Sequence, residues 1–531
     1  MRRVNIKVLC CAGLLLLISY PSYAGSGGDE KEEKVKGKHR RIVDEAEFFY
    51  SIEDHFMSQR IYEDLAELYP ENAEFNFRLG FSYLHLRNQE RKAIPYLEKA
   101  AAADFTPAFY FLGEAYHMNE EFDKALEALD TYRKRPDHTL SHSRIDLAEE
   151  RTLTAMKMLS NPTKVGIKKL DANVNTEFQD YAPNIDPEGK YLYFTSRREG
   201  STGNFQDPEG IYFEDIYVSR NVVGAWTPAE PVNGPVNSDG HDANVNFSAS
   251  GNSLLIYRTH RNLYSGDLYL STRGKTGWDE PVKLPMSINT DEYHEPSAAF
   301  SPDEQEIYVV SDRPGGFGGK DIYIIRKLPN GQWSNPENLG REINSAFDED
   351  APFVSLDGNS LFFSSMGHNA IGGYDVFRAK RMTDETWSQV DHLGYPINTV
   401  HDDIYFSVTA DGKRGFLSSS RSDNMDIYEV DMLFEQDDLV VLKGSIIDDY
   451  SGLPVNATIH FLDAKTGETF TSVITNYLTG NYVAAIMPDK KYRMIVEAMG
   501  YRDYSDKVEV KVQEKGEFKA VQKDVNLDKY Q

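Results

Sequence analysis

Acidic residues and histidines recur at the start of five similar segments between residues 180 and 430, and their types and spacing could do chemistry. The candidates are Asp180, His241-Asp242, His294-Glu295, Asp348-Glu349 and His401-Asp402. If the segments meet around one axis, these side chains could bind a metal ion or a sugar. Alternatively, each forms a hydrogen bond that fixes its own turn, and recurrence in every segment favours this structural role. The predicted structural network comprises Asp180, Asp242, His294, Asp348 and Asp402.

The chain shows none of the short motifs that would indicate an enzyme. It has no Gly-x-Ser-x-Gly elbow, and His294-Glu295 is followed by Pro296 instead of continuing as a His-Glu-x-x-His zinc motif. The glycine-rich stretch 315–319 lies between predicted strands, where glycine serves a hairpin and does not cradle a phosphate. We therefore expect no catalytic residue, no metal site and no cofactor.

The repeat that carries these residues predicts the central fold. Each unit ends in a similar tripeptide: Asp215-Ile216-Tyr217, Asp267-Leu268-Tyr269, Asp321-Ile322-Tyr323, Asp375-Val376-Phe377 and Asp426-Ile427-Tyr428. A period of about 50 residues built of short strands and turns is typical of a β-propeller. We predict five blades over residues 163–432, with six as the alternative. The strand near 165–169 is expected to complete the blade that begins at Asp402, which closes the ring.

Residues 42–160 have a different pattern, with apolar residues at helical spacing and few glycines or prolines. Leu79-Gly80 and Tyr83 return as Leu112-Gly113 and Tyr116, a shift of 33 residues. This resembles the tetratricopeptide repeat, whose first helices line a groove that suits a peptide. The predicted groove residues are Phe77, Phe81, Leu84, Tyr110, Glu114 and His117. Packing against a neighbouring helix or against the propeller is the alternative role for them.

The two ends of the chain predict export and a third domain. Arg2, Arg3 and Lys7 precede an apolar run that is too short to span a bilayer, so residues 1–24 are predicted to be a cleavable signal peptide. Lipidation of Cys11 is disfavoured because the apolar run follows that cysteine. Residues 25–41 are predicted to be a disordered linker. Short strands and turns over 437–528 predict an antiparallel β-sandwich.

Charge and cysteine content restrict the partners. The 531-residue chain has 57 basic and 84 acidic residues, a net charge of −27, which argues against nucleic acid as a partner. Both cysteines lie within the predicted signal peptide, so the mature chain would have no disulfide. No other apolar run approaches the length of a membrane span.

The modules and their order resemble known families. The unit with Pro296, Phe300-Ser301-Pro302-Asp303 and Ser311-Asp312-Arg313 is similar to the repeats of TolB-type periplasmic propellers, with Glu304 in place of a glycine. The C-terminal stretch, with Gly444 and Thr479-Gly480, is similar to carboxypeptidase-regulatory-like domains. Helical repeats, propeller and sandwich in this order resemble PorE-type envelope proteins of type IX secretion and gliding systems. Those proteins end in an OmpA-type peptidoglycan-binding domain, which we expect to be absent here.

These patterns together predict a multidomain protein with an α part and an all-β part. We expect a non-enzymatic periplasmic scaffold, associated with the outer membrane, that binds protein subunits of an envelope or secretion complex. A propeller that binds glycan or peptide is the alternative. The loops 197–214, 313–320 and 366–374 are the expected contact regions, because function is carried where repeated units differ.

Overall fold

The computed structural model describes residues 35–530 except 87–88, 208–209, 261–264, 383–385, 423, 433–438 and 512–519. The predicted signal peptide and residues 25–34 of the predicted linker lie outside the described residues. Helix α1 begins at Arg40, so the last two residues of that predicted linker, Arg40 and Arg41, are helical. Among the described residues, no helix combines the length and the apolar character needed to cross a membrane.

The N-terminal part is a stack of antiparallel helices. Its members are α1 (Arg40–Ser51), α2 (His55–Leu68), α3 (Ala73–Leu84), α4 (Glu90–Ala102), α5 (Thr106–Met118), α6 (Phe122–Lys134) and α7 (His142–Ser160). The repeated glycines lie where paired helices approach closely. A Cβ atom on Gly80 would come within 2.7 Å of Leu97 Cγ, and one on Gly113 within 2.8 Å of Leu129 Cγ. A larger residue therefore could not pack at either position without displacing the partner helix.

The middle of the chain forms five antiparallel sheets. The first contains β2 (Asp180–Ile185), β3 (Tyr191–Ser196), β4 (Asp215–Val222), β5 (Ala225–Trp226) and β6 (Glu230–Pro231). The second contains β7 (Asp242–Phe247), β8 (Ser253–Thr259), β9 (Gly266–Gly274), β10 (Gly277–Trp278) and β11 (Val282–Lys283). The third contains β12 (Ala298–Phe300), β13 (Glu306–Ser311), β14 (Asp321–Arg326) and β15 (Glu337–Asn338). The fourth contains β16 (Glu349–Val354), β17 (Ser360–Ser365), β18 (Asp375–Lys380) and β19 (Asp391–His392). The fifth contains β20 (Asp403–Val408), β21 (Arg414–Ser419), β22 (Asp426–Asp431) and, at its outer edge, β1 (Gly166–Lys169).

These sheets close into a ring, which makes this part a β-propeller. Their first strands contact one another in the circular order β2, β7, β12, β16, β20 and back to β2. The predicted closure is present, because β1 pairs with β22 from Gly166 opposite Asp431 to Lys169 opposite Tyr428. The chain therefore returns to its own start and leaves no open edge between the first and last sheets.

The C-terminal part is a sandwich of two sheets. One contains β26 (Asn481–Ile486), β23 (Val440–Asp448), β29 (Val521–Gln522) and β30 (Val525–Leu527), and the other contains β25 (Thr469–Ile474), β24 (Thr458–Asp463), β27 (Lys491–Glu497) and β28 (Tyr504–Glu509). The prediction of a wholly antiparallel sandwich is wrong, because β29 and β30 pair with β23 in parallel. β29 and β30 follow β28 in the sequence but belong to the other sheet, where they run in the same direction as β23.

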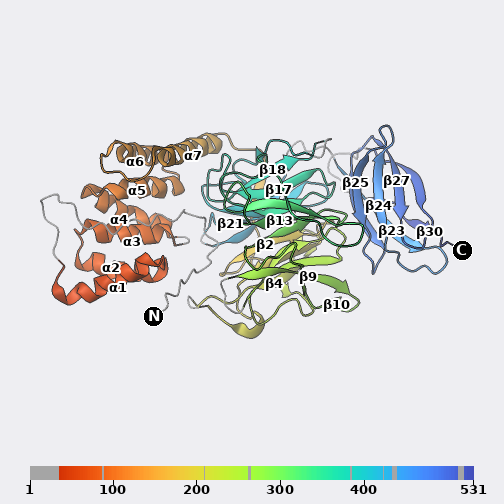
Figure 1. The fold of residues 1–531 in the computed structure, drawn as a ribbon, viewed down its shortest axis with the longest axis horizontal. Coiled ribbons are helices and arrows are strands. Elements are labelled where there is room, and N and C mark those ends of the chain that lie inside the picture. Colours follow the sequence, from red (N-terminus) through yellow and green to blue (C-terminus); the bar gives the residue numbers. More distant parts are fainter. Residues whose placement is uncertain are drawn as a thin grey trace.

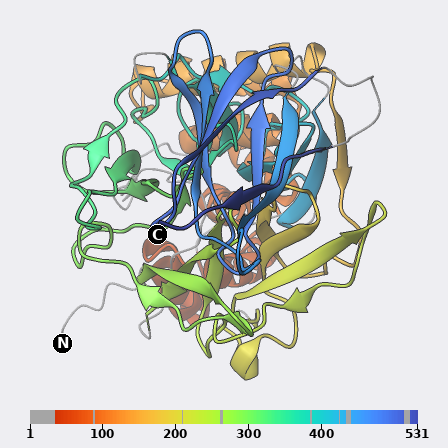
Figure 2. The ribbon, with the colours of Figure 1, turned by 90° about the vertical axis from the view of Figure 1, so that its right-hand side faces the viewer.

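The three parts lie in a row, with the propeller between the helical stack and the sandwich (Figure 1). Viewed along the row, the sandwich lies in front of the ring (Figure 2). The buried side chains of Ala155, Ile371 and Val400 join the end of α7 to the propeller. On the opposite side, propeller residues Leu356 and Ala410 belong to the same apolar core as the sandwich.

Candidate functional site

The recurring acidic residues fix the turn that enters each sheet. They are Asp180, Asp242, Glu295, Glu349 and Asp403, all buried. Each accepts hydrogen bonds from the backbone N–H and the hydroxyl of a threonine or serine in the preceding turn. In the first sheet, Asp180 Oδ2 lies 2.6 Å from Thr176 N and 2.7 Å from Thr176 Oγ1. Ser238, Thr290, Ser345 and Thr399 do the same in the other sheets.

The predicted network is correct for Asp180 and Asp242, but it is displaced by one residue in the other three sheets. Glu295, Glu349 and Asp403 hold the position predicted for His294, Asp348 and Asp402. Successive side chains of a strand point to opposite faces, so a shift of one residue changes the face on which a side chain lies. The sequence offers two adjacent polar residues at each of these points, and the pattern alone does not distinguish them.

The displaced residues connect the third, fourth and fifth sheets to the sheet that precedes each of them. Asp348 Oδ1 accepts a hydrogen bond from Lys320 N at 3.1 Å, and Asp402 Oδ1 accepts one from Tyr374 N at 2.9 Å. His294 lies with its Nε2 2.9 Å from the hydroxyl of Tyr257. Asp348, Asp402 and His294 therefore have hydrogen-bond partners within the propeller, in a contact different from the predicted one.

Lys320 lies at the centre of a buried charged cluster on the same side of the ring. Its Nζ lies 3.1 Å from Asp350 Oδ2, 3.4 Å from Asp348 Oδ2 and 3.0 Å from the hydroxyl of Tyr374. Burial alone would lower the pKa of Lys320, but the two carboxylates hold it well above its usual range. Ser297 donates a further hydrogen bond to Asp350. The charges of Lys320, Asp348 and Asp350 are thus paired within the cluster.

Glu349 is the exception among the five acidic residues. The other four carboxylates are each paired with an arginine: Arg198 with Asp180, Arg258 with Asp242, Arg313 with Glu295 and Arg421 with Asp403. Arg198, Arg313 and Arg421 each stand two residues after the serine that ends the second strand, and Gly367 has that position in the fourth sheet. Burial accordingly raises the pKa of Glu349 to about 7.

The helical stack covers part of this side of the propeller. His117 Nε2 donates to the carbonyl oxygen of Ile371 at 2.7 Å, and burial lowers the pKa of His117 to about 4, so the ring stays neutral at physiological pH. Loop 366–374, an expected contact region, is therefore occupied by the chain's own helical stack. Nothing in the sequence pattern of either part links these two residues.

The predicted groove residues fall into two groups. Phe77, Tyr110 and His117 are buried, so they are core or interdomain residues and are not available to a partner. Phe81, Leu84 and Glu114 are partly exposed. The Phe81 ring lies against the ring of His85, which follows α3, with centroids 4.1 Å apart. The exposed part of the predicted groove is thus smaller than the sequence indicated.

Loop 197–214 remains exposed and carries aromatic side chains. Within it, Gln206 and Tyr212 form a β-bridge, so the described part of the loop folds as an arm. The Phe205 side chain is 51% exposed, and the Phe213 ring stacks on His241 with centroids 4.0 Å apart. An arm of this kind can stack on a planar or apolar group of a ligand or partner.

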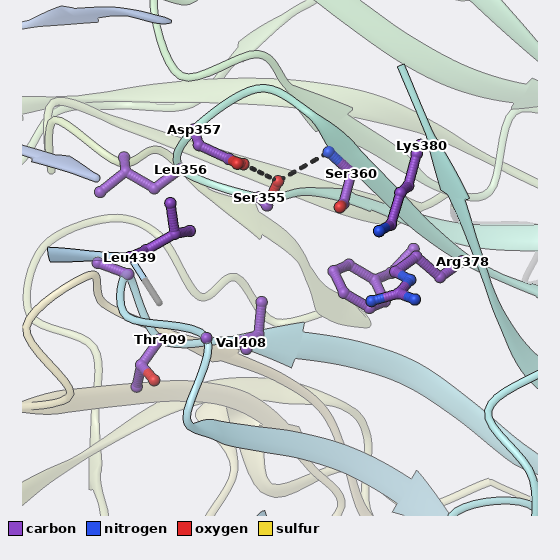
Figure 3. A pocket seen from close by; sticks show the side chains of 12 residues that line it. Ser355, Leu356, Asp357, Ser360, Arg378, Lys380, Val408, Thr409 and Leu439 are labelled. Carbon is purple, nitrogen blue, oxygen red and sulfur yellow. Dashed lines mark hydrogen bonds between the residues drawn. The ribbon is translucent and has the colours of Figure 1, made fainter. Parts of the chain in front are cut away.

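The opposite side of the propeller meets the sandwich. Asn252 Nδ2 donates to Thr475 O at 2.9 Å, and Asn252 Oδ1 accepts from Tyr477 N at 3.1 Å. A small pocket of about 50 Å³ lies beside this junction, lined by residues that include Ser355, Asp357, Arg378, Thr409 and Leu439 (Figure 3). Its volume is enough for a few water molecules but not for a sugar or a peptide.

Within the described ranges, no group of three or more histidine, cysteine, aspartate and glutamate side chains is placed to hold a metal ion. The acidic residues of the ring are separated, one at the entrance of each sheet, and they face hydroxyl, amide and guanidinium donors. The geometry therefore supports turn fixation at these positions.

Comparisons with known proteins find similarity in structure only. No protein-family model matches the chain, and no curated protein matches it. A putative TolB from Agrobacterium tumefaciens is 17% identical, with 61% of this chain and 97% of that chain covered and a TM-score of 0.29. An alpha-L-arabinofuranosidase from Lactobacillus brevis is 14% identical, with 51% and 94% covered and a TM-score of 0.34. An endo-arabinase from Bacteroides thetaiotaomicron is 13% identical, with 51% and 99% covered and a TM-score of 0.34. These similarities are too low to assign an activity.

Proposed function

We propose that this protein is a non-enzymatic scaffold of the cell envelope, built from tetratricopeptide-like repeats, a five-bladed TolB-like propeller and a regulatory-like sandwich. Its place would be the periplasm, in association with the outer membrane. Its partners would be protein subunits of an envelope or secretion assembly, as the order of modules in type IX secretion proteins suggests. The observation that carries the proposal is that a flanking domain packs on each side of the propeller.

This arrangement favours a scaffold for a physical reason. The contacts of Ile371 with the helical stack and of Asn252 with the sandwich use the two sides on which a propeller usually binds a ligand. They also hold three modules in one row, so that surfaces on different modules keep fixed separations (Figure 1). Partners bound to two such surfaces gain a high effective concentration for each other.

Site-specific photo-cross-linking in cells tests the scaffold role. A photoreactive residue is introduced at Phe205 on the exposed arm, at Leu84 on the helical stack, or at the exposed turn residue Gln332 as the matched control. The expected result is defined adducts with envelope subunits from Phe205 or Leu84 and none from Gln332. Recovery of the protein without adducts from any of these positions, in the soluble periplasm, would contradict the proposal.

A second candidate function is capture of a glycan or peptide by the aromatic arm. The exposed Phe205 ring and the stacked Phe213–His241 pair are the observation that favours it. A ligand of this type should raise the melting temperature of the purified protein. The Phe205→Ala variant should lose that stabilisation, whereas a screen of sugars and peptides without any effect on wild type would exclude this function.

A further inference from the structure

The tip of the sandwich exposes a cluster of large apolar side chains. Tyr450 is 100% exposed, Met499 98%, and Leu453 and Tyr530 are each 64% exposed. They come from three separate segments: the turn after β23, the turn after β27 and the residues after β30. Side chains of this size are rarely exposed together without a function.

Hydrogen bonds hold these three segments together. Asp448 Oδ2 accepts from the Tyr501 hydroxyl at 2.9 Å and lies 2.8 Å from Lys529 Nζ, while Asp448 Oδ1 accepts from Ser451 N at 2.7 Å. Tyr530 N donates to Gly500 O at 3.2 Å. One buried carboxylate thus joins the three segments, so the apolar side chains share a fixed platform.

Seven backbone N–H groups of the tip are hydrogen-bonded within it. Hydrogen bonds within the sandwich engage the N–H groups of Asp448, Asp449, Ser451, Gly452, Tyr501, Arg502 and Tyr530. This matters for the choice of occupant, because backbone groups without a partner make entry into a lipid layer unfavourable. The tip meets this requirement at these seven N–H groups, and its apolar side chains protrude beyond them.

We propose that this tip docks the protein on a lipid bilayer, with Tyr450, Leu453, Met499 and Tyr530 inserted among the headgroups. Tyrosine suits this position because its ring is apolar and its hydroxyl remains at the polar interface. A specific protein interface buries about 800 Å² on each partner, whereas four side chains on turns offer much less contact area. The inference does not rest on the proposed scaffold role.

The charges near the tip favour an electrically neutral lipid surface. Four acidic residues and two basic ones lie on these segments: Asp448, Asp449, Asp503, Asp528, Arg502 and Lys529. The excess of negative charge gives no attraction to anionic lipids. Binding should therefore depend on apolar insertion and change little with ionic strength. Strand β30 lies at the end of the molecule opposite the helical stack, so docking by this end would leave the other modules free (Figure 1).

Co-sedimentation with sucrose-loaded vesicles of phosphatidylethanolamine and phosphatidylcholine tests the proposal. The purified protein is compared with Tyr450→Ser/Met499→Ser and with Val282→Ser/Met286→Ser, a matched control that removes two exposed apolar side chains from the propeller (67% and 62% exposed). We expect wild type and control to sediment with vesicles at low and high salt. The tip variant should partition at least about tenfold more weakly.

Several outcomes would overturn the proposal. They are absence of vesicle binding by wild type, equal binding by the tip variant, or loss of binding at high salt. Sedimentation velocity without lipid tests whether the tip binds a second copy of the chain instead. In that case wild type would self-associate, and only the tip variant would lose this association. Leu453→Ser/Tyr530→Ser provides an independent variant, and unchanged thermal melting verifies that each variant is folded.

Discussion

At the scale of single residues, the ring of carboxylates shows how the propeller balances buried charge. A buried carboxylate is unfavourable unless hydrogen bonds and an opposite charge accompany it. Asp180, Asp242, Glu295 and Asp403 have both, since each accepts from a hydroxyl and pairs with an arginine. Glu349 has hydrogen bonds from Ser345 and Ser365 but no arginine in the described structure. Its environment therefore favours the protonated form.

Replacing this group should stabilise the protein, and the effect should depend on pH. The pKa of Glu349 rises from 4.5 in the unfolded chain to about 7 in the folded one, so stability is lost as pH increases through this interval. The Glu349→Gln variant removes that loss. We expect it to unfold with a free energy higher than wild type by on the order of 1–3 kcal/mol at pH 8, and by little at pH 4.5. Urea denaturation at both pH values measures the difference.

The matched control is Glu295→Gln, at the equivalent position of the third sheet. Here Arg313 Nη2 lies 3.1 Å from Glu295 Oε1, and the substitution leaves that guanidinium without its counter-charge. This variant should be less stable than wild type at pH 8. Destabilisation of both variants to the same extent would contradict the special role assigned to Glu349.

At the scale of elements, the innermost strands depart from regular β-structure. The pairings of β2 with β3, β16 with β17 and β20 with β21 each contain a register shift. Ala182, Ala351 and Tyr405 lie at these shifts with positive φ angles of 53°, 50° and 61°. An irregularity of this kind bends a strand and redirects its side chains. The carboxylate at the start of each strand and the side chains after the register shift therefore contact different partners.

The sequence predicts the elements better than it predicts their contacts. The recurring Asp-Ile-Tyr endings and the Leu79-Gly80 and Leu112-Gly113 pairs locate the repeats because periodic packing needs the same residue types at the same positions. The one-residue displacement at His294 has no such signal, since two adjacent polar residues stand there. Docking of His117 on Ile371 joins residues 254 positions apart, and no local pattern encodes it.

The contact between the helical stack and the propeller depends on a small buried surface. Ile371 is fully buried against Ala155 and Val400, so Ile371→Asp would place a charge in an apolar junction. We expect the helical stack to separate from the propeller while both remain folded. Small-angle scattering should show a larger radius of gyration, and protease should cleave faster near residues 160–164. Phe317→Asp, on the equivalent loop of the third sheet and 38% exposed, is the control and should change neither measurement.

At the scale of the whole molecule, the two junctions of the propeller differ in kind. The junction with the helical stack is a small apolar cluster to which His117 adds an interdomain hydrogen bond. The junction with the sandwich is continuous with the sandwich core, which includes Leu356 and Ala410, and it adds the hydrogen bonds of Asn252. A shared core couples the unfolding of two domains, whereas a small contact leaves them separable. The propeller and sandwich should therefore behave as one unit.

This coupling can be tested at Asn252, which is buried and bonds both Thr475 O and Tyr477 N. In Asn252→Ala both backbone groups lose their partner, at a cost of about 1–3 kcal/mol for each buried group. Calorimetry of wild type should show propeller and sandwich unfolding in one transition. The variant should show the sandwich melting first, in a separate transition, while Asn330→Ala in an exposed turn should match wild type. Two separate transitions in wild type would contradict a shared core, and the sandwich would then be a tethered domain and not a fixed end of the row.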